Sequence, residues 1–365
     1  MNINISEKYD IKALLAIFED LKFTHYRLTA DRDLMTLDDT AIAYMEYFTI
    51  HNPSGPVESL QIRDGRFKLS TLNPFALLKN LTYLDLAGLT WISDLGPLAN
   101  LSDLNFLGLD DGVNIRDLGP LARLTELGFL TLNRLRLVKD LKPLASLSHL
   151  YHLDLSGGGA LEDLSPLGSL SELTLLDLSG CLKITDISPL GALANLKNLN
   201  LAKSRVLKDI KVLAALNKLT YLNLGDCPSL EELEPLRDLG ELSSLVLFGD
   251  HEIRDFSPLA GLANLSYLVM SGDQHLANLE PLKNLRKLIH LNLSGCQALK
   301  DLRPLSELTN LTHLDLSGCL RVADLNPLLG LNQLNYLDLT GCGGLAGLEE
   351  LAGRADLKII GQRAC

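Results

Sequence analysis

One spacing constrains the fold of this chain more than any other feature: leucine recurs every 23 residues over most of its length. Twelve units of 23 residues follow one another over residues 81–356 without an insertion or a deletion. The repeated position holds Leu81, Leu104, Leu127, Leu150, Leu173, Leu196, Leu219, Leu242, Leu265, Leu288, Leu311 and Leu334, and Leu357 follows them. A fixed period of about 20–50 residues is typical of repeat arrays, in which each unit completes the apolar core of its neighbours.

The order of residues inside one unit predicts its secondary structure. Leu176 and Leu178 alternate with the outward positions Leu175, Asp177 and Ser179, which is the period of a strand with one buried face. Pro189 follows, and proline suits the first position of a helical turn because its missing N–H is not needed there. One strand per unit predicts a parallel sheet, with a short helical turn behind each strand.

Residues 173–193 read L-x-x-L-D-L-S-G-C-x-x-I-x-D-I-x-P-L-x-x-L. This unit resembles the leucine-rich repeat family, whose core reads L-x-x-L-x-L-x-x-N/C-x-L. It is most similar to the short bacterial internalin-type repeat, with one added residue and cysteine in place of asparagine. The resemblance implies an α/β solenoid with a curved parallel sheet on the concave face and short helical turns on the convex face, and it favours a bacterial origin.

The repeat pattern also predicts the domain organisation. We expect a solenoid of about 13 repeats over residues 57–345, whose first unit has one extra residue. Residues 1–56 do not fit the repeat and are predicted to form a helical N-terminal cap, with helices over 9–23 and 37–48. The alternative is a separate partner-binding module. Residues 346–365 lose the pattern, because Gly347, Glu350 and Arg354 replace the usual acidic residue, proline and leucine of the unit, and they are predicted to be a C-terminal cap.

Charge and apolar runs exclude several classes of function. The formal net charge is −12, which disfavours a nucleic-acid backbone as ligand. No run approaches the roughly 18 apolar residues of a membrane span. The first residues, MNINISEKYDIK, lack a basic segment followed by an apolar one, so we expect no signal peptide and a cytoplasmic location. Delivery into a host cell by a non-classical route stays open.

Two repeated columns look chemical but are predicted to be structural. Cys181, Cys227, Cys296, Cys319 and Cys342 share one column, where we expect buried, reduced thiols rather than zinc ligands. An acidic residue recurs at another column, from Asp94 to Asp324, and is expected to bond the backbone of its own turn.

No cofactor, metal or catalytic residue is expected. Gly157–Gly159 lacks the lysine of a phosphate-binding loop. His290, His313 and Asp315 would lie on an open sheet without the enclosure of a catalytic metal. The repeats consume residues 57–365, and residues 1–56 are too few for most catalytic folds, so we predict that the chain is not an enzyme.

The outward-facing strand positions form the candidate binding site. The first outward column is rich in aromatic residues, and the second, two residues later, is rich in carboxylates. Both are typical of a surface that binds a polypeptide with basic side chains. The predicted partner-binding residues are Tyr83, Phe106, Phe129, His152, Asp154, Asp177, Tyr221, Val246, Phe248, Tyr267, Val269, His290, His313, Asp315, Tyr336 and Asp338.

Val246, Phe248, Tyr267 and Val269 are predicted to form one apolar patch at the centre of binding. The function favoured by the sequence is a non-enzymatic, monomeric protein-binding scaffold, whose more specific forms are a bacterial effector and an inhibitor or immunity-type regulator of an enzyme. Two other interpretations stay open. The stacked aromatics could serve only to pack neighbouring strands, and the array could be structural, with no single partner.

Overall fold

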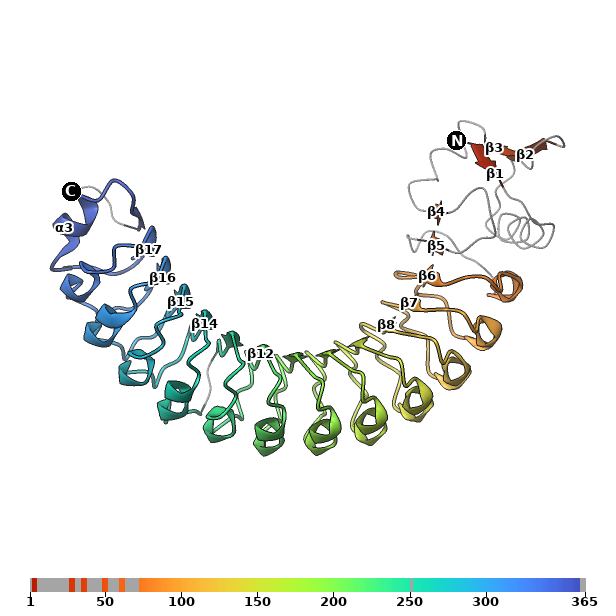
Figure 1. Ribbon diagram of the computed structural model, residues 1–365, viewed down its shortest axis with the longest axis horizontal. Helices are drawn as coiled ribbons and strands as arrows, with labels where there is room; N and C mark the ends of the chain where they lie inside the picture. The colour runs from red at the N-terminus through yellow and green to blue at the C-terminus, as the bar shows by residue number, and fades with distance from the viewer. Residues whose placement is uncertain are drawn as a thin grey trace. The chain divides into compact units, whose positions relative to one another are not determined.

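The computed structural model describes residues 2–4, 26–29, 34–37, 48–51, 59–62, 72–249 and 252–361. The chain divides into two compact units, Met1–Cys181 and Leu182–Cys365. Within each unit, strands line the inner side and short 3-10 helices line the outer side (Figure 1). Each unit is therefore a segment of α/β leucine-rich repeat solenoid, as the repeat pattern predicts.

The first unit repeats one strand and one 3-10 helix. Its parallel strands are β5 (Ser59–Ile62), β6 (Tyr83–Asp85), β7 (Phe106–Gly108), β8 (Phe129–Thr131), β9 (His152–Asp154) and β10 (Leu175–Asp177). Its 3-10 helices are η2 (Asn73–Leu77), η3 (Gly96–Asn100), η4 (Gly119–Arg123), η5 (Lys142–Ser146) and η6 (Ser165–Ser169).

The described part of residues 1–56 consists of strands, which the sequence pattern did not predict. Strands β1 (Asn2–Asn4), β3 (Leu34–Leu37) and β2 (Tyr26–Thr29) form an antiparallel sheet in that order. Strand β4 (Phe48–His51) pairs antiparallel with β5. The helix predicted over 9–23 lies outside the described residues. The helix predicted over 37–48 is wrong at both ends, because Leu37 belongs to β3 and Phe48 to β4.

The second unit continues the same alternation. Its parallel strands are β11 (Asn198–Asn200), β12 (Tyr221–Asn223), β13 (Ser244–Val246), β14 (Tyr267–Val269), β15 (His290–Asn292), β16 (His313–Asp315), β17 (Tyr336–Asp338) and β18 (Lys358–Ile360). Its helices are η7 (Ser188–Ala192), η8 (Lys211–Ala215), η9 (Glu234–Leu236), η10 (Ser257–Gly261), η11 (Glu280–Leu282), η12 (Arg303–Glu307), η13 (Asn326–Leu328) and α3 (Leu348–Ala352).

The fixed period explains the regular core. Paired residues on neighbouring strands are 23 positions apart, as in Leu153 and Leu176 or Leu245 and Leu268, so each leucine stacks on the same leucine of the next repeat. Leu176, Leu268 and the other leucines of this column have at most 2% of their surface exposed. Proline lies in the first turn of nearly every 3-10 helix, and the leucine that follows is buried against the strand.

Arg354 closes the last repeat of the second unit. Its guanidinium donates to the backbone carbonyl oxygens of Leu331 (2.8 Å), Asn332 (3.1 Å) and Leu334 (2.8 Å), and it pairs with Asp356 at 2.7 Å. A polar side chain at a column that holds leucine in the preceding repeats therefore satisfies backbone acceptors of the repeat before it.

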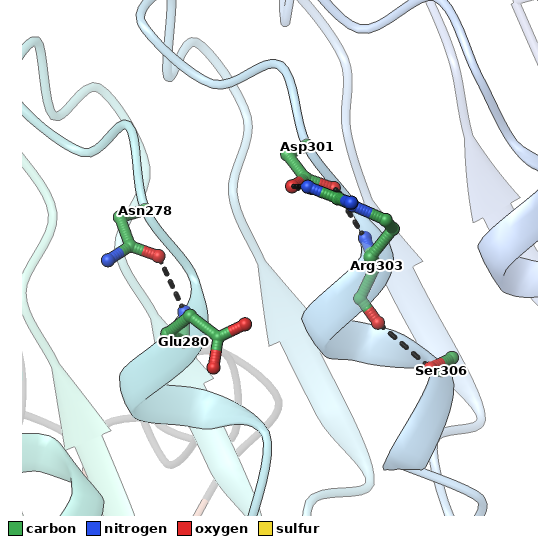
Figure 2. A network of polar contacts seen from close by, with 5 residues as sticks. All are labelled: Asn278, Glu280, Asp301, Arg303 and Ser306. Carbon is green, nitrogen blue, oxygen red and sulfur yellow. Dashed lines mark hydrogen bonds and ion pairs between the residues drawn. The ribbon is translucent and has the colours of Figure 1, made fainter.

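The acidic column on the outer side bonds its own turn, which confirms the sequence prediction. An oxygen of Asp186 accepts the backbone N–H of Ser188 at 2.8 Å, and Asp94, Asp117, Asp140, Asp163, Asp209, Asp255, Asp301 and Asp324 do the same two residues on. Figure 2 shows the arrangement in two neighbouring repeats, with Asn278 accepting from Glu280 and Asp301 accepting from Arg303. The Arg303 guanidinium also pairs with Asp301 at 2.6 Å.

These turns predict how stability depends on pH. Hydrogen bonds from Ser165, Ser257 and Arg303 lower the pKa of Asp163 and Asp255 below 3.8, and that of Asp301 to about 2. A carboxyl whose pKa is lowered by folding stabilises the native state above its unfolded pKa, and this contribution is lost as the pH falls through the folded value. We expect the urea midpoint to fall as the pH drops from about 4 to about 2.

Asparagine provides the matched control, because Asn278 makes the same bond without a titrating group (2.9 Å). The triple variant Asp163→Asn, Asp255→Asn and Asp301→Asn should lose less of its urea midpoint over the same pH interval, when unfolding is followed by circular dichroism. Equal pH dependence in the variant and the wild type would contradict this account of the turns.

Candidate functional site

The inner side of each sheet presents the two columns predicted from the sequence. Burial alternates along each strand, so that Leu176 is buried while Leu175 and Asp177 are half-buried and face outward. Every described ring of the first column is half-buried except Tyr267, which is 42% exposed. Residues 23 positions apart are paired on neighbouring strands, as Tyr83 is with Phe106 and Tyr267 with His290. The side chains of each column therefore lie in a row across the strands.

In the first unit, four predicted residues form one stack of rings. The ring of Phe106 lies 4.1 Å from Tyr83 and 4.8 Å from Phe129, measured between centroids, and His152 stacks on Phe129 at 3.7 Å. We call Tyr83, Phe106, Phe129 and His152 the first-unit ladder. Stacked rings cover one another's faces, so the ladder offers its apolar ring edges to solvent.

Tyr151 joins this surface and was missed by the sequence prediction. It is 45% exposed and meets Phe129 edge-on, with 6.4 Å between ring centroids. A Cβ at Gly128 would lie 2.6 Å from the Tyr151 ring, so the absence of a side chain one repeat earlier makes room for it. The signal in the sequence is this pairing of a glycine with a tyrosine 23 residues later, in the column before the ladder.

The carboxylates beside the ladder have a structural role in addition to their charge. Oδ1 of Asp154 and of Asp177 each accepts a backbone N–H two residues on, from Ser156 and Ser179, at 2.7 Å. Asparagine makes the same bond elsewhere in this column, as in Asn223, whose oxygen accepts from Gly225 at 2.9 Å. Aspartate and asparagine at this column therefore both supply the oxygen that accepts the backbone N–H of the turn. Only the aspartates add a negative charge, so the charge of the column differs between repeats.

Burial and nearby carboxylates shift the titration of two groups in the first unit, Asp110 and His152. Burial raises the pKa of Asp110, whose oxygen accepts from the Asn133 backbone, and the charges of Asp154 and Asp85 raise it further. Burial lowers the pKa of His152, against the opposing pull of Asp154 and Asp177. An aromatic row thus lies next to concentrated negative charge, an arrangement that suits contact with a cationic group.

The second unit carries a different row of rings. His290 and His313 stack at 4.2 Å, Tyr267 is tilted over His290 at 5.7 Å, and Tyr336 lies 5.6 Å from His313. The Lys358 ammonium lies 5.7 Å from the centre of the Tyr336 ring and extends the row, which the sequence prediction missed. Asp315 and Asp338 are neighbours in register beside these rings. Tyr221 lies apart, between Asn198 and Ser244.

The structure brings the predicted apolar patch together in part. Val246 and Val269 are paired in register on β13 and β14, and Tyr267 begins β14. The ring of Phe248 covers Gly225 of the preceding repeat so closely that a Cβ there would collide with it. The patch therefore extends from Gly225 to Val269. The Phe248 ring can occupy its position only because residue 225 has no side chain.

The cysteine column is structural, as predicted. Cys181, Cys227, Cys296 and Cys319 are buried free thiols, and Cys342 is half-buried. Each Sγ donates to the carbonyl oxygen of the residue 26 positions earlier, for example Cys181 to Leu155 at 3.2 Å and Cys319 to Leu293 at 3.0 Å. Burial raises the pKa of Cys181, Cys296 and Cys319 to about 12. Such thiols remain protonated and are poor nucleophiles and metal ligands.

Other kinds of site find little support in the described residues. Within them, no three histidine, cysteine or acidic side chains gather as they would around a metal ion. In the same part of the chain, no helix combines the length and the apolar character needed to cross a membrane.

Comparisons with known proteins agree with the repeat architecture. A family model described as leucine-rich repeats, in two copies, matches residues 286–330. The crystal structure of an internalin from Listeria monocytogenes is similar over 96% of this chain and 94% of its own, with 26% identity and a TM-score of 0.73. A leucine-rich repeat protein from Leptospira interrogans matches 80% of this chain and 86% of its own, with 19% identity and a TM-score of 0.58.

The functional domain of InlJ from Listeria monocytogenes, described as including a cysteine ladder, matches 82% of this chain and 71% of its own, with 19% identity and a TM-score of 0.51. A search of curated proteins found no match. The 23-residue leucine pattern, the register of the strands and these similarities show that the chain belongs to the leucine-rich repeat family, with repeats of the internalin type.

Proposed function

We propose that the chain is a non-enzymatic scaffold that binds a polypeptide partner through the inner faces of its sheets. The observation that carries the proposal is the presentation of aromatic rings in register on the first outward column, with Phe106 stacked between Tyr83 and Phe129. Aromatic side chains that are packed by rigid neighbours, yet half-exposed, lose little conformational entropy on binding and are common interface anchors.

The charges beside the rings favour a partner with basic side chains. In the first unit, Asp154 and Asp177 are paired in register beside His152, and Oδ1 of each accepts the backbone N–H two residues on. In the second unit, Asp315 and Asp338 repeat the arrangement beside His313 and Tyr336. Complementary charge of this kind raises association rates and selects against acidic partners.

The more specific forms of this function differ in the identity of the partner. An effector that acts in a host cell would bind a host protein, whereas an inhibitor or immunity-type regulator would bind an enzyme of its own cell. Both would use the same inner faces. A structural array without a single partner is the contrasting interpretation, and it predicts that no protein is captured through these residues.

The test is crosslinking affinity capture from native lysate with a matched pair of variants. Phe248→Ser combined with Tyr267→Ser removes two large side chains from the inner face of the second unit, and we expect it to abolish capture. The control is Leu320→Ser, which removes an equally apolar side chain that is 64% exposed on the turn after β16. The control should capture the partner as well as the wild type does.

Capture that is unchanged in the inner-face variant would remove the second unit from the binding site. Loss of capture in both variants would indicate a general loss of folding, which circular dichroism of each variant detects separately.

A further inference from the structure

The second unit contains a shallow hollow over strands β14 to β17. Its volume is about 180 Å³, and its walls include Tyr267, His290, His313, Asp315 and Tyr336. This is smaller than the roughly 300–1,000 Å³ of sites that enclose a drug-sized ligand, and it has room for a single long side chain. The hollow opens on the same inner face as the proposed protein-binding surface.

The rings around the hollow are unevenly spaced. His290 and His313 stack at 4.2 Å, whereas Tyr267 and Tyr336 are 5.7 Å and 5.6 Å from the nearer histidine. The Thr312 hydroxyl lies 2.8 Å from Nδ1 of His313 and fixes that ring. The hollow is therefore centred on a pair of imidazoles, with a tyrosine on either side.

Two carboxylates, those of Asp315 and Asp338, lie beside the histidines. Oδ1 of Asp315 accepts the Ser317 N–H and Oδ1 of Asp338 accepts the Thr340 N–H, both at 2.8 Å. Neither carboxylate forms an ion pair with any residue that the structure describes. The nearest cation in the row is Lys358, which lies over Tyr336.

These groups set the charge of the hollow. Two carboxylates and one ammonium give a net charge of −1 when both imidazoles are neutral, and +1 when both are protonated. The other outward residues of β13 to β18, among them Ser244, Val246, Val269 and Asn292, carry no charge. The sign of the local charge therefore depends on the two histidines alone between about pH 5 and pH 8.

We propose that this hollow binds a lysine or arginine side chain of the polypeptide partner, and that protonation of the His290–His313 pair releases it. The proposal rests on the proposed protein-binding function and specifies which kind of partner side chain enters the hollow. At neutral pH the tyrosine rings and Asp315 attract the cation, and the aliphatic part of the lysine or arginine side chain packs against the rings. In acid, the imidazolium charges repel it.

The titration of His290 has a clear direction. Burial lowers the pKa of His290 below 6.5, and the neighbouring His313 lowers it further. His290 is therefore neutral at about pH 7.5 and gains charge only as the pH falls below the ordinary histidine value. Binding of a cation favours the neutral pair, so acidification must weaken binding.

The experiment uses a defined probe, the peptide acetyl-Gly-Arg-Gly-Lys-Gly-Arg-Gly-amide, whose charge is constant between about pH 5.5 and pH 7.5. Its affinity for the full chain is measured by calorimetry at both pH values and low salt. The wild type should bind about tenfold more weakly at the lower pH. The variant His290→Asn with His313→Asn should change by less than about twofold, because asparagine occurs naturally in this column at Asn198.

Two further variants locate the effect. Asp315→Asn with Asp338→Asn keeps the acceptor oxygens of the turns, as Asn292 does (2.8 Å), and should weaken binding at the higher pH. His149→Asn, at an exposed turn histidine outside both rows of rings, should keep the full pH dependence of binding. A tenfold drop that persists without His290 and His313, or normal binding without the two carboxylates, would overturn the proposal.

Peptide binding in the hollow and capture of a partner by the inner faces are tested separately. If the wild type binds the peptide at neither pH, the hollow has no cation-binding role. Capture of a lysate protein by the wild type, and its loss in the Phe248→Ser, Tyr267→Ser variant, would still support the protein-binding function. Tighter peptide binding in acid would also overturn the hollow's assignment, because it reverses the predicted sign.

Discussion

Replacing Leu268 with alanine is expected to lower the free energy of unfolding by about 2–5 kcal/mol. Leu268 is fully buried, with 0% of its surface exposed, and it stacks between Leu245 and Leu291 of the neighbouring repeats. Truncation removes apolar contacts with both neighbours and leaves a cavity that the paired strands cannot easily close.

The matched control is the same substitution at Leu320, which is 64% exposed. Its cost should stay within about 0.5 kcal/mol, because little apolar surface is lost from the core. Urea unfolding followed by circular dichroism gives the free energy of unfolding of both variants. The loss in Leu268→Ala should be accompanied by faster amide hydrogen exchange in β13 to β15. Similar costs at the two positions would show that stability does not depend on the stacked leucine columns.

The second large effect is expected on partner affinity. Combining Phe106→Ser with Phe129→Ser should weaken binding of the captured partner by at least about 30-fold, the scale of an interface anchor worth roughly 2 kcal/mol. Both rings belong to the first-unit ladder, and their loss also uncovers one face of Tyr83 and one of His152. Surface plasmon resonance with the purified partner gives the affinity directly.

A conservative variant separates binding from strand packing. Phe106→Leu with Phe129→Leu keeps apolar bulk at positions where the same column already holds Leu175, but it removes the ring stack. We expect intermediate affinity and near-normal stability. If the serine variant loses stability while its affinity stays normal, the ladder serves to pack neighbouring strands and contributes nothing to recognition.

The repeat period made most of the solenoid predictable. Because residues 23 positions apart pair across the sheet, one correctly assigned strand fixes the place of every other, from Tyr83 to Tyr336. The buried cysteines and the turn-bonding aspartates followed from the same argument, since a residue repeated in nearly every unit has a role that every unit needs. The strands β1, β2 and β3 are short and not repeated, so no such periodicity revealed them.

The candidate site was predictable in position but less so in chemistry. The columns of rings and carboxylates are where the sequence pattern placed them, whereas the backbone bond of Asp154 was overlooked. The sequence does carry that signal, because asparagine and aspartate, which share an acceptor oxygen, dominate this column. Tyr151 and Lys358 were missed because their contacts depend on side-chain direction, which spacing alone does not give.

Hydroxyl-radical footprinting of the complex with the captured partner tests the central claim most directly, because aromatic side chains are among the groups that it labels readily. If the inner faces bind the partner, the labelling of Phe106, Phe129, Tyr267 and Tyr336 falls on complex formation, while that of Leu320 stays constant. Unchanged labelling of these rings, with protection confined to residues of the outer 3-10 helices, would contradict the assignment of the inner faces as the binding site.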